Sequence, residues 1–417
     1  MSNTPKIRFT GFDEEWNPRK LSDIGEIITG TTPSTQHSEY YSEDGIPWVT
    51  PTDITDNLIY DTPRKLSPLG EKVARVVPAE TILVTCIASI GKNTMLANAG
   101  SFNQQINALV PNKQEYDPYF LLTESHHWSA KMKREAASGT MQIVNKNEFS
   151  SIKTYVPKRP EQESIGNYFK SIDNLIALCQ QEYEKLTSLK SACLNKMFPK
   201  NGSKTPELRF SGFVGNWKQS KFSVIFDILQ NNTLSRAELS LEDGVAKNVH
   251  YGDVLVKFGE YLNVSQADLP YIVTQQVVDK LKGSLLQNGD IVMADTAEDE
   301  TVGKCSEISG MQIIPIIAGL HTIPMRPKIK FASGYLGYYM NSDAYHDQLL
   351  PLMQGIKVTS VSKGAIQDTI ISFPADIAEQ AAIGQYFIRL DNLINLHQRK
   401  LKKLKQLRQS MLHNMFV

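Results

Sequence analysis

The sequence contains two copies of one extended pattern, and this duplication constrains the fold more than any other feature. Residues 161–198 return without a gap as residues 379–416, with 18 of 38 positions identical. A shorter phrase, PKIRFTGFDEEW (5–16), returns as PELRFSGFVGNW (206–217), 201 residues later. We therefore predict two copies of one unit of about 200 residues, too few for a solenoid array.

Weaker matches lie between these two segments and keep the same order, which chance would not produce. They pair PAETILVT (78–85) with QNGDIVMA (287–294), SIGK (89–92) with TVGK (301–304), ALVP ending at Pro111 with HTIP ending at Pro324, and Tyr119 with Tyr335. The offset grows from 201 to 218. Such growth is expected if the second copy gained residues in surface loops.

Each copy begins with a long stretch that mixes strand and helix patterns. Short β-branched runs predict strands, and these runs lie in 46–54, 81–90, 106–111, 253–258 (DVLVKF), 290–294 and 310–325. Helices are expected near 117–137 and 333–353. The predicted class is α+β, with two similar mixed α/β globular domains at 1–156 and 205–373.

Each copy ends in a segment that is typical of a long helix, 157–204 and 374–417. Apolar residues recur there in the four–three alternation of a coiled-coil seam, at Ile165, Phe169, Ile172, Ile176, Ile383, Phe387, Leu390, Ile394, Leu401 and Leu404. Pro160 and Pro199 are expected to bound the first helix. Because such a seam must be covered, we expect the helices to form an antiparallel coiled coil with an internal pseudo-two-fold. The alternative is that each helix packs on its own domain.

Composition excludes several classes of protein. The chain is 41% hydrophobic and 21% charged, as in a globular protein with ordinary cores. No run approaches 18 apolar residues, and the first residues do not resemble a secretory signal. The four cysteines show no CxxC spacing, which argues against a zinc site or a disulfide framework, and lie at Cys86, Cys179, Cys193 and Cys305. A reducing cytoplasm is the expected location.

Motifs for cofactor chemistry are missing from the sequence. It contains no G-x-G, no Walker loop, no HExxH and no GxSxG, and it lacks the Asp/Asn-Pro-Pro-aromatic motif of amino-methyltransferases. His126 and His127, the one adjacent histidine pair, are expected on a helix surface. The chain is therefore predicted to be non-catalytic and to hold no metal or cofactor of its own.

The layout of globular domain, long helix, globular domain and long helix resembles the DNA-specificity subunit of type I restriction-modification systems. The phrases that carry the resemblance are RFTGF (8–12), ITGTTPS (28–34), IPWVTPTDI (46–54), SIGKN (89–93), NQQINALVP (103–111) and EQESIGNYFKSIDNLI (161–176). The second domain has no counterpart of PWVTP or NQQI. This difference suggests that the two domains read different bases.

The resemblance implies that each globular domain is a target-recognition domain for one half of a split double-stranded DNA site. The helices would set the separation of the halves and dock two methyltransferase subunits. Those partners would bind S-adenosylmethionine and methylate adenine N6, and a further ATP-driven restriction and translocation subunit would cut DNA. Two rivals stay open: a twin-domain protein scaffold without DNA preference, and an enzyme whose site carries no known motif.

Candidate DNA contacts are polar and basic residues expected in loops. In the first domain they are Thr31, Thr32, Ser34, Thr50, Thr52, Asp53, Ser89, Lys92, Asn103, Gln104, Gln105, Lys131, Lys133, Arg134 and Thr140. In the second they are Thr301, Lys304, Arg326, Lys328, Lys357 and Thr359. The alternative is that the Thr and Asp side chains form turn hydrogen bonds and that the lysines are solvated. Trp48 is expected in the core, and Trp16 and Trp217 are expected to pack each domain on the helices.

The charge distribution complicates this reading. Residues 1–156 and 201–373 each carry a net charge of −3, whereas residues 157–200 carry +2 and residues 374–417 carry +4. An autonomous DNA-binding domain usually has a basic balance. Phosphate contacts are therefore expected to come partly from the basic segment 397–409 and from partner subunits.

Overall fold

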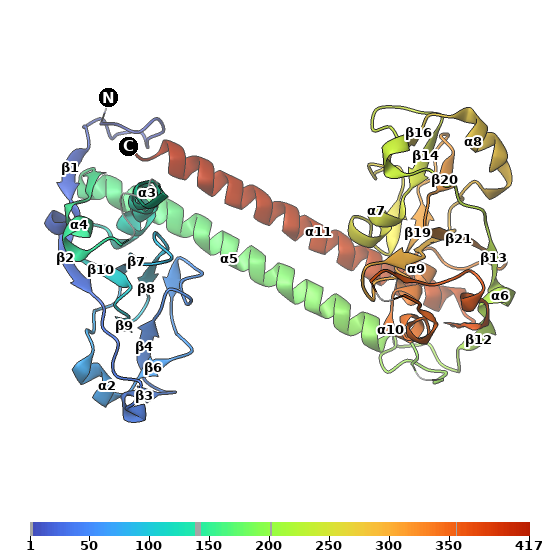
Figure 1. The fold of residues 1–417 in the computed structure, drawn as a ribbon, viewed down its shortest axis with the longest axis horizontal. Coiled ribbons are helices and arrows are strands. Elements are labelled where there is room, and N and C mark those ends of the chain that lie inside the picture. Colours follow the sequence, from blue (N-terminus) through green and yellow to red (C-terminus); the bar gives the residue numbers. More distant parts are fainter. Residues whose placement is uncertain (1–2, 138–142, 201, 356) are drawn as a thin grey trace. The chain divides into compact units, whose positions relative to one another are not determined.

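A computed structural model describes residues 3–137, 143–200, 202–355 and 357–417. The chain divides into two compact units: unit 1 comprises residues 1–180 and 399–417, and unit 2 comprises residues 181–398. The chain passes between the units twice, each time inside a helix, α5 (Arg159–Lys196) or α11 (Ile377–Asn414) (Figure 1).

Unit 1 is built on a five-stranded sheet in the order β2-β10-β7-β8-β5, a four-stranded sheet in the order β3-β6-β4-β9, and the antiparallel pair β1-β11. The strands are β1 (Asn17–Lys20), β2 (Gly25–Thr29), β3 (Tyr41–Ser42), β4 (Ile46–Val49), β5 (Leu58–Ile59), β6 (Lys65–Leu66), β7 (Ile82–Thr85), β8 (Asn93–Leu96), β9 (Ser101–Phe102), β10 (Ile106–Pro111) and β11 (Lys153–Val156). The helices are α1 (Leu21–Ile24), α2 (Pro68–Val73), α3 (Pro118–Ala137) and α4 (Lys146–Ser151), with a 3-10 turn η1 (Ser38–Tyr40).

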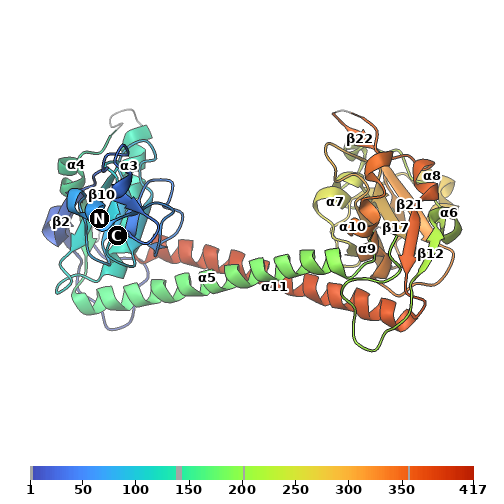
Figure 2. The ribbon, with the colours of Figure 1, turned by 90° about the horizontal axis from the view of Figure 1, so that it is seen from below.

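Unit 2 repeats this plan with a five-stranded sheet β13-β21-β17-β19-β15, a three-stranded sheet β16-β14-β20, and the pairs β12-β23 and β18-β22. Figure 2 shows β17 and β21, neighbours in the five-stranded sheet, side by side. The strands are β12 (Lys218–Lys221), β13 (Phe226–Ile228), β14 (Ala246–Val249), β15 (Tyr261–Asn263), β16 (Tyr271–Ile272), β17 (Ile291–Ala294), β18 (Thr296–Ala297), β19 (Cys305–Ser309), β20 (Ile316–Ala318), β21 (Thr322–Pro327), β22 (Thr359–Ser360) and β23 (Ile370–Phe373). The helices are α6 (Phe222–Ile225), α7 (Tyr251–Val256), α8 (Gln275–Lys280), α9 (Tyr335–Met340) and α10 (Asp343–His346), with 3-10 turns η2 (Arg236–Glu238), η3 (Lys282–Ser284), η4 (Leu350–Leu352) and η5 (Ala365–Asp368).

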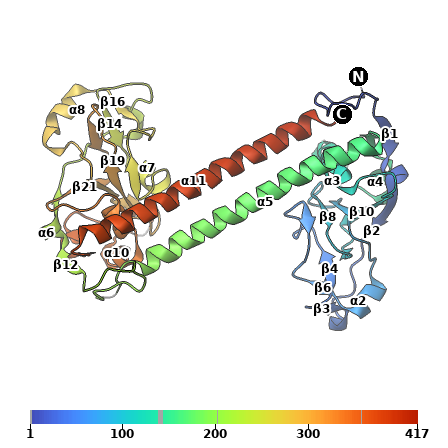
Figure 3. The same ribbon diagram turned by 180° about the vertical axis from the view of Figure 1, so that it is seen from behind.

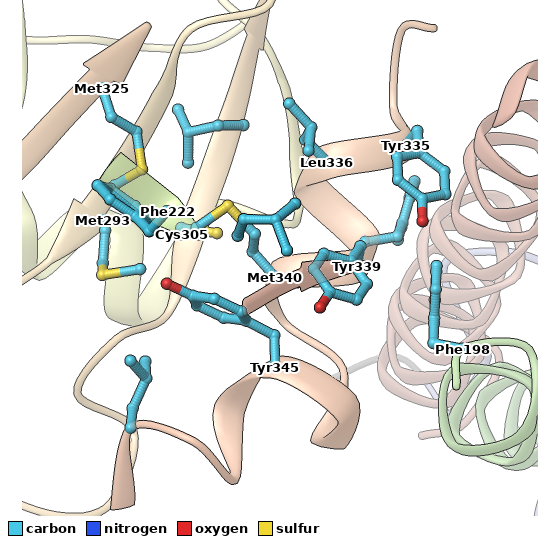
Figure 4. Close-up of a cluster of buried hydrophobic side chains, with 14 of the residues drawn as sticks. Phe198, Phe222, Met293, Cys305, Met325, Tyr335, Leu336, Tyr339, Met340 and Tyr345 are labelled. Atoms are coloured by element: carbon cyan, nitrogen blue, oxygen red, sulfur yellow. The ribbon is translucent and has the colours of Figure 1, made fainter. Parts of the chain in front are cut away.

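In each unit an aromatic cluster joins the core to the helices, as predicted for the two tryptophans. In unit 1 Phe416, near the end of the chain, packs against Trp16, Phe120 and Phe169. In unit 2 Phe198 takes the equivalent place, and its ring meets those of Trp217, Tyr335, Tyr339 and Phe387. Figure 4 shows Phe198 facing Tyr335 and Tyr339, with the sulfur-rich core of Met293, Cys305, Met325 and Met340 behind them.

Within each unit, α5 and α11 pack in antiparallel directions. In unit 1 the ring of Phe169 packs on that of Phe416, and Asp173 pairs with Arg408. The residue number therefore rises along one helix as it falls along the other (Figure 3). In unit 2 Phe198 meets Phe387 and Lys190 meets Asp391. All ten predicted seam residues are buried or half-buried, whereas the intervening Leu175, Leu178, Leu393 and Leu396 are exposed.

The duplication extends to single backbone hydrogen bonds. Thr31 N donates to Phe102 O at 2.9 Å, and Asn232 N donates to Ala318 O at 2.9 Å. Thr85 N donates to Lys92 O, as Ala294 N donates to Lys304 O, both at 2.9 Å. The predicted equivalence of SIGK and TVGK is thus confirmed, and Gly91 and Gly303 both adopt a positive φ there.

The backbone also corrects parts of the predicted alignment. Leu109 and Met325 occupy the same place in their sheets, since they pair with Ile82 and Ile291 respectively. The counterpart of Pro111 is therefore Pro327 and not Pro324. The offset between equivalent residues of the two copies does not grow throughout. Val49 and Val249 accept equivalent hydrogen bonds and are 200 residues apart, one fewer than the 201 of the entry phrases that precede them.

One predicted strand is a helix. DVLVKF lies mostly in α7, where Gly252 N donates to His250 Nδ1 at the N-cap. Val254 and Phe258, four residues apart, are buried in the same cluster, and this spacing fits a helical face. A short apolar run of six residues does not distinguish the two periods.

Two helix boundaries also differ from the prediction. Pro160 lies inside the first turn of α5, a position where the missing N–H costs nothing. The predicted helix at 333–353 is broken into α9 and α10. Asn341 ends α9 because its side chain donates to Gly337 O at 2.7 Å and Cys305 O at 2.8 Å.

The four cysteines are buried and form no disulfide in the described residues. Within those same residues no cluster of His, Cys, Asp and Glu is arranged to hold a metal ion. None of the described helices combines the length and apolarity that a membrane span requires.

Candidate nucleic-acid interface

Three loops of unit 1 meet at one end of its two larger sheets, and we call this region the loop edge of unit 1. The loops are residues 30–34 after β2, 50–53 after β4, and 103–105 between β9 and β10. Thr31 N bonds Phe102 O and Asn103 N bonds Val49 O, both at 2.9 Å. A Cβ atom at Gly30 would lie 2.1 Å from the carbonyl oxygen of Asn103. Only glycine therefore lets the first and third loops approach so closely.

The predicted side chains of the loop edge bond to one another. Thr32 Oγ1 donates to Gln104 Oε1, and Asn103 Nδ2 donates to Gln105 Oε1 at 3.0 Å. Thr50 Oγ1 lies 2.7 Å from Asp53 Oδ2 and 2.8 Å from Thr52 Oγ1. Ser34 Oγ is 3.4 Å from Gln36 N. The structure thus brings these residues together, and the turn hydrogen bonds of the alternative reading are present.

Lys92 and Lys133 extend the loop edge along the SIGK turn. Lys92 Nζ donates to Pro51 O at 3.0 Å, while Ser89 O accepts from Thr85 Oγ1 at 2.5 Å. Lys133 lies against the same turn, since a Cβ at Gly91 would be 2.8 Å from Lys133 Cε. Lys131 and Arg134 are exposed on the last turns of α3. Thr140 falls outside the described residues.

Two exposed cations at the loop edge escaped the sequence reading. Arg75 N donates to Thr31 Oγ1 at 3.0 Å, and the Arg64 guanidinium lies 6.0 Å from the ring centre of the buried Trp48. Each is a single charge in an ordinary loop, and only the fold places it beside the predicted residues.

Unit 2 has an equivalent loop edge with different side chains. Gly319 N donates to Val249 O at 2.8 Å, as Asn103 N does to Val49 O. Asp295 N donates to His321 O as Cys86 N does to Gln105 O. The backbone positions of PWVTP and NQQI are therefore present in unit 2 with other residues: the triplet Asn103–Gln105 is replaced by Gly319–His321.

His321 is the most distinctive residue of this second edge. It is exposed, and its φ of 55° lies in the left-handed region that non-glycine residues rarely adopt. Its ring lies 5.3 Å from that of Tyr251, which in turn lies 4.7 Å from that of His250. Lys363 Nζ donates to Asn231 Oδ1 at 3.1 Å at the same edge. None of these five residues was predicted, and the offset to Gln105 was the one signal that could have found His321.

The predicted residues of unit 2 fall into two separate groups. Thr301 and Thr359 lie at the end of β17 that carries the loop edge, since Thr359 pairs with Ala297. Lys357, two residues before Thr359 in the sequence, is exposed. Arg326 and Lys328 lie at the opposite end of the sheet. Arg326 forms a bidentate ion pair with the buried Asp290, in which Nε donates to Oδ1 at 2.9 Å and Nη2 donates to Oδ2 at 2.7 Å. Lys328 Nζ donates to Ser223 O at 3.0 Å.

The profile of the family described as "Type I restriction modification DNA specificity domain" matches the chain twice, over residues 13–188 and 215–406. The chain belongs to this family. Each match lies mainly in one globular domain and continues into the helix that follows it.

Curated specificity subunits are similar to this chain. The HindI subunit of Haemophilus influenzae is 28% identical over 192 residues, which cover 44% of this chain and 40% of that protein. The MjaIX subunit of Methanocaldococcus jannaschii is 28% identical over 182 residues, 42% of each protein. These two alignments span less than half of the relatives' length. The MjaVIII subunit of the same organism is 20% identical over 96% of this chain and 92% of its own length.

A solved specificity subunit has the same fold. The crystal structure of the S subunit of a type I restriction-modification system from M. genitalium aligns over 99% of both chains, with a TM-score of 0.59 and 13% sequence identity. The α+β class with two repeated domains, predicted from the sequence, is thereby confirmed.

The two loop edges of this specificity-family chain differ in charge. The SIGK turn of unit 1 is neutral apart from Lys92, whereas the equivalent segment of unit 2, DTAEDETVGK (295–304), holds four acidic residues. Lys304 does not offset them at the surface, because its Nζ donates to Leu255 O at 2.7 Å. Burial lowers the pKa of Lys304. The pKa of His250 is also lowered, mainly by burial and to a smaller extent by the positive charge of Arg236 nearby.

Proposed function

We propose that this chain is the DNA-recognition subunit of a type I restriction-modification complex and reads a two-part target. In this proposal each unit reads one half of the target through its loop edge. The chain itself performs no chemistry. S-adenosylmethionine and ATP are bound by partner subunits, which methylate and cut the DNA that this chain selects.

One observation carries the proposal: equivalent backbone positions at the two loop edges hold different polar side chains. Asn103 and Gln105 suit adenine, because an amide can pair with both N6 and N7 of that base. His321 stands where Gln105 stands in unit 1 and has different hydrogen-bonding capacity. Two readers of one fold with different side chains are suited to two unlike half-sites. Two sites on one ligand also raise each other's effective concentration when the spacing fits.

Exposed leucines support the docking of two copies of one partner. In unit 1 Leu175, Leu178 and Leu407 are 47%, 59% and 40% exposed; their equivalents in unit 2, Leu393, Leu396 and Leu189, are 46%, 59% and 45% exposed. Each set of three, which we call a leucine patch, combines residues from α5 and α11. Apolar residues repeated on a helix surface are typical of a protein–protein contact. Two equivalent patches predict two identical partners.

We expect Leu175→Glu with Leu178→Glu to remove one partner from the complex. Two charges in an apolar contact should weaken binding at that patch at least tenfold, or about 1.4 kcal/mol. The measurement is the mass of the complex formed with the methyltransferase subunit of the same system, by light scattering. The exposed Glu182→Gln is the control. Retention of two partners at wild-type affinity would exclude the patch as the docking surface.

Positive charge on α11 supports phosphate binding next to the loop edges. Arg399, Lys400, Lys402, Lys403 and Lys405 are all exposed. The globular parts are acidic on balance, so cations on the helix and on the partners supply the electrostatic attraction in this proposal. The chain alone should then bind DNA weakly and lose that binding steeply as salt rises.

The function is tested by mapping methylated adenines in a host that expresses this chain with its methyltransferase subunits. We expect one motif of two short blocks separated by unread bases. Replacing Asn103, Gln104 and Gln105 by alanine should alter the motif in one block only. Matched triple replacement of the exposed Glu43, Asp44 and Ser42 by alanine is the control. A continuous motif would contradict the proposal.

A twin-domain scaffold is the second candidate. It predicts that the complex selects no sequence from a pool of random duplexes. The different polar side chains at the two loop edges argue against it, because a scaffold for two identical partners has no need of unlike edges.

A further inference from the structure

Each unit contains a cluster of polar side chains centred on an aspartate of the helix pair, Asp173 or Asp391, and we call it the helix node. In unit 1 Asp173 of α5 accepts from Arg408 Nε at 2.5 Å, from Tyr119 Oη at 2.8 Å and from Asn57 Nδ2 at 2.8 Å. One carboxylate thus holds groups from the other helix, from α3 and from the loop that leads into β5.

Unit 2 repeats the node with different chemistry. Asp391 of α11 accepts from Tyr338 Oη at 2.6 Å and is paired with Lys190 Nζ at 2.7 Å. Lys190 Nζ also donates to Glu260 Oε2 at 2.7 Å. Glu260 is the counterpart of Asn57. The backbone oxygen of Asn57 accepts from Met95 N where β5 pairs with β8, and that of Glu260 accepts from Glu307 N where β15 pairs with β19, both at 2.9 Å.

In each unit, one loop of the loop edge and one residue of the helix node belong to the same segment of chain. In unit 1 residues 50–57 run from the end of β4, at the loop edge, to Asn57. In unit 2 residues 250–260 run from the end of β14 through α7 to Glu260. Both segments are held at a second point by equivalent lysines, Lys92 bonding Pro51 O at 3.0 Å and Lys304 bonding Leu255 O at 2.7 Å.

This arrangement appears twice although the side chains differ. In unit 1 the amide of Asn57 bonds Asp173, and in unit 2 the carboxylate of Glu260 bonds Lys190, the counterpart of Arg408. The same backbone position is thus attached to the helix pair in both units through different partners, which indicates that the attachment itself is required and not a particular residue. The segments carry part of each loop edge, and a shift of about 1 Å in a polar group that reads a base is enough to lose its hydrogen bond.

We propose that Asn57 and Glu260 are positioning residues for target recognition, each of which fixes the segment that forms part of its loop edge by tying it to the helix pair. Neither residue touches DNA in this proposal. It rests on the proposed function, because it assigns the loop edges to the two half-sites.

The test is a crossed comparison of Asn57→Ala and Glu260→Ala in the complex with the methyltransferase subunits. The measurement is the ratio of methylation rates, kcat/KM, on the mapped target and on duplexes with one base pair changed in either half. Asn57→Ala should lower discrimination three- to tenfold in one half only. Glu260→Ala should do the same in the other half only. Glu260→Gln, whose amide oxygen still accepts from Lys190, should stay close to wild type.

Exposed residues outside the nodes provide matched controls, Asn98→Ala for unit 1 and Glu242→Ala for unit 2. Thermal unfolding of every variant shows whether it folds, and a merely structural loss would lower activity on all duplexes alike. Unchanged discrimination in both halves, or an equal loss in both, would overturn the positioning role. A wild-type complex that recognises one continuous block would refute the proposed function before any variant is compared.

Discussion

Replacement of Phe416 by alanine is expected to destabilise unit 1 by about 3–5 kcal/mol, the usual cost of emptying an aromatic site in a core. Phe416 is 5% exposed, and its ring centre lies 5.5 Å from that of Phe120, 5.7 Å from that of Phe169 and 5.9 Å from that of Trp16. The loss should appear as a lower urea midpoint for unit 1. In a Trp217→Phe background, fluorescence reports unit 1 alone, because the other three tryptophans lie there.

Two variants distinguish this effect from a general loss of stability. Phe198→Ala removes the equivalent ring from unit 2 and should leave the fluorescence transition of unit 1 in place. Val417→Ala changes an exposed neighbour and should alter the unfolding free energy by less than about 0.5 kcal/mol. An unchanged urea midpoint for Phe416→Ala would show that the end of the chain is not part of the core of unit 1.

Unit 2 is expected to lose up to about 3 kcal/mol of stability as the pH rises from 4.5 to above 7. The cause is Glu307, which is 2% exposed and accepts from Gly334 N at 2.6 Å and from Gly337 N at 3.0 Å. Burial raises the pKa of Glu307 from 4.5 to about 7, against the lowering effect of these hydrogen bonds. Between these pH values the folded unit binds more protons than the unfolded chain. The contribution of Glu307 to stability is therefore fully present below pH 4.5 and is lost as this carboxyl ionises.

Glu307→Gln removes this ionisation, so the difference in unfolding free energy between variant and wild type should change by about 3 kcal/mol across the interval. Urea unfolding at several pH values measures it, followed by the fluorescence of Trp217 in a background in which Trp16, Trp48 and Trp128 are replaced by phenylalanine. The exposed Glu242→Gln should run parallel to wild type. A constant difference between Glu307→Gln and wild type would mean that Glu307 ionises as it does in the unfolded chain.

The sequence predicted the repeated helices and most of the central strands because their signals are local and periodic. Residues 161–198 and 379–416 align without a gap, and INALVP (106–111) coincides with β10. DVLVKF was misassigned because the N-cap at His250 decides between helix and strand, and histidine is an uncommon cap. The predicted pairing of Tyr119 with Tyr335 was also wrong. Phe120 occupies the place of Tyr335, since each packs on the tryptophan of its unit.

The candidate site was predicted better in unit 1 than in unit 2. Thr31, Thr50 and Asn103 lie in polar loops beside recognisable phrases, and the fold brings them together. In unit 2 the same backbone carries His321 and Asn231. The segment 319–322 has no residue in common with NQQI, and the segment 231–233 shares only its threonine with GTT. Hydrogen bonds of the main chain preserve the edge while the side chains vary, so residue matching could not find it. Asn57 and Glu260 were missed because their role depends on helix residues that are distant in the sequence, 116 positions away for Asn57 and 70 for Glu260.

The participation of Phe416 in the core of unit 1 has a consequence for biosynthesis. A ribosome makes the amino-terminal domain first, but its aromatic cluster is complete only once Met415 and Phe416 have been synthesised. Unit 2 meets no such delay, since Phe198 precedes it in synthesis. We therefore expect unit 2 to complete its core before unit 1, the reverse of the usual order in which the amino-terminal part folds first. In that case the first domain would expose part of its aromatic cluster while residues 181–398 are translated.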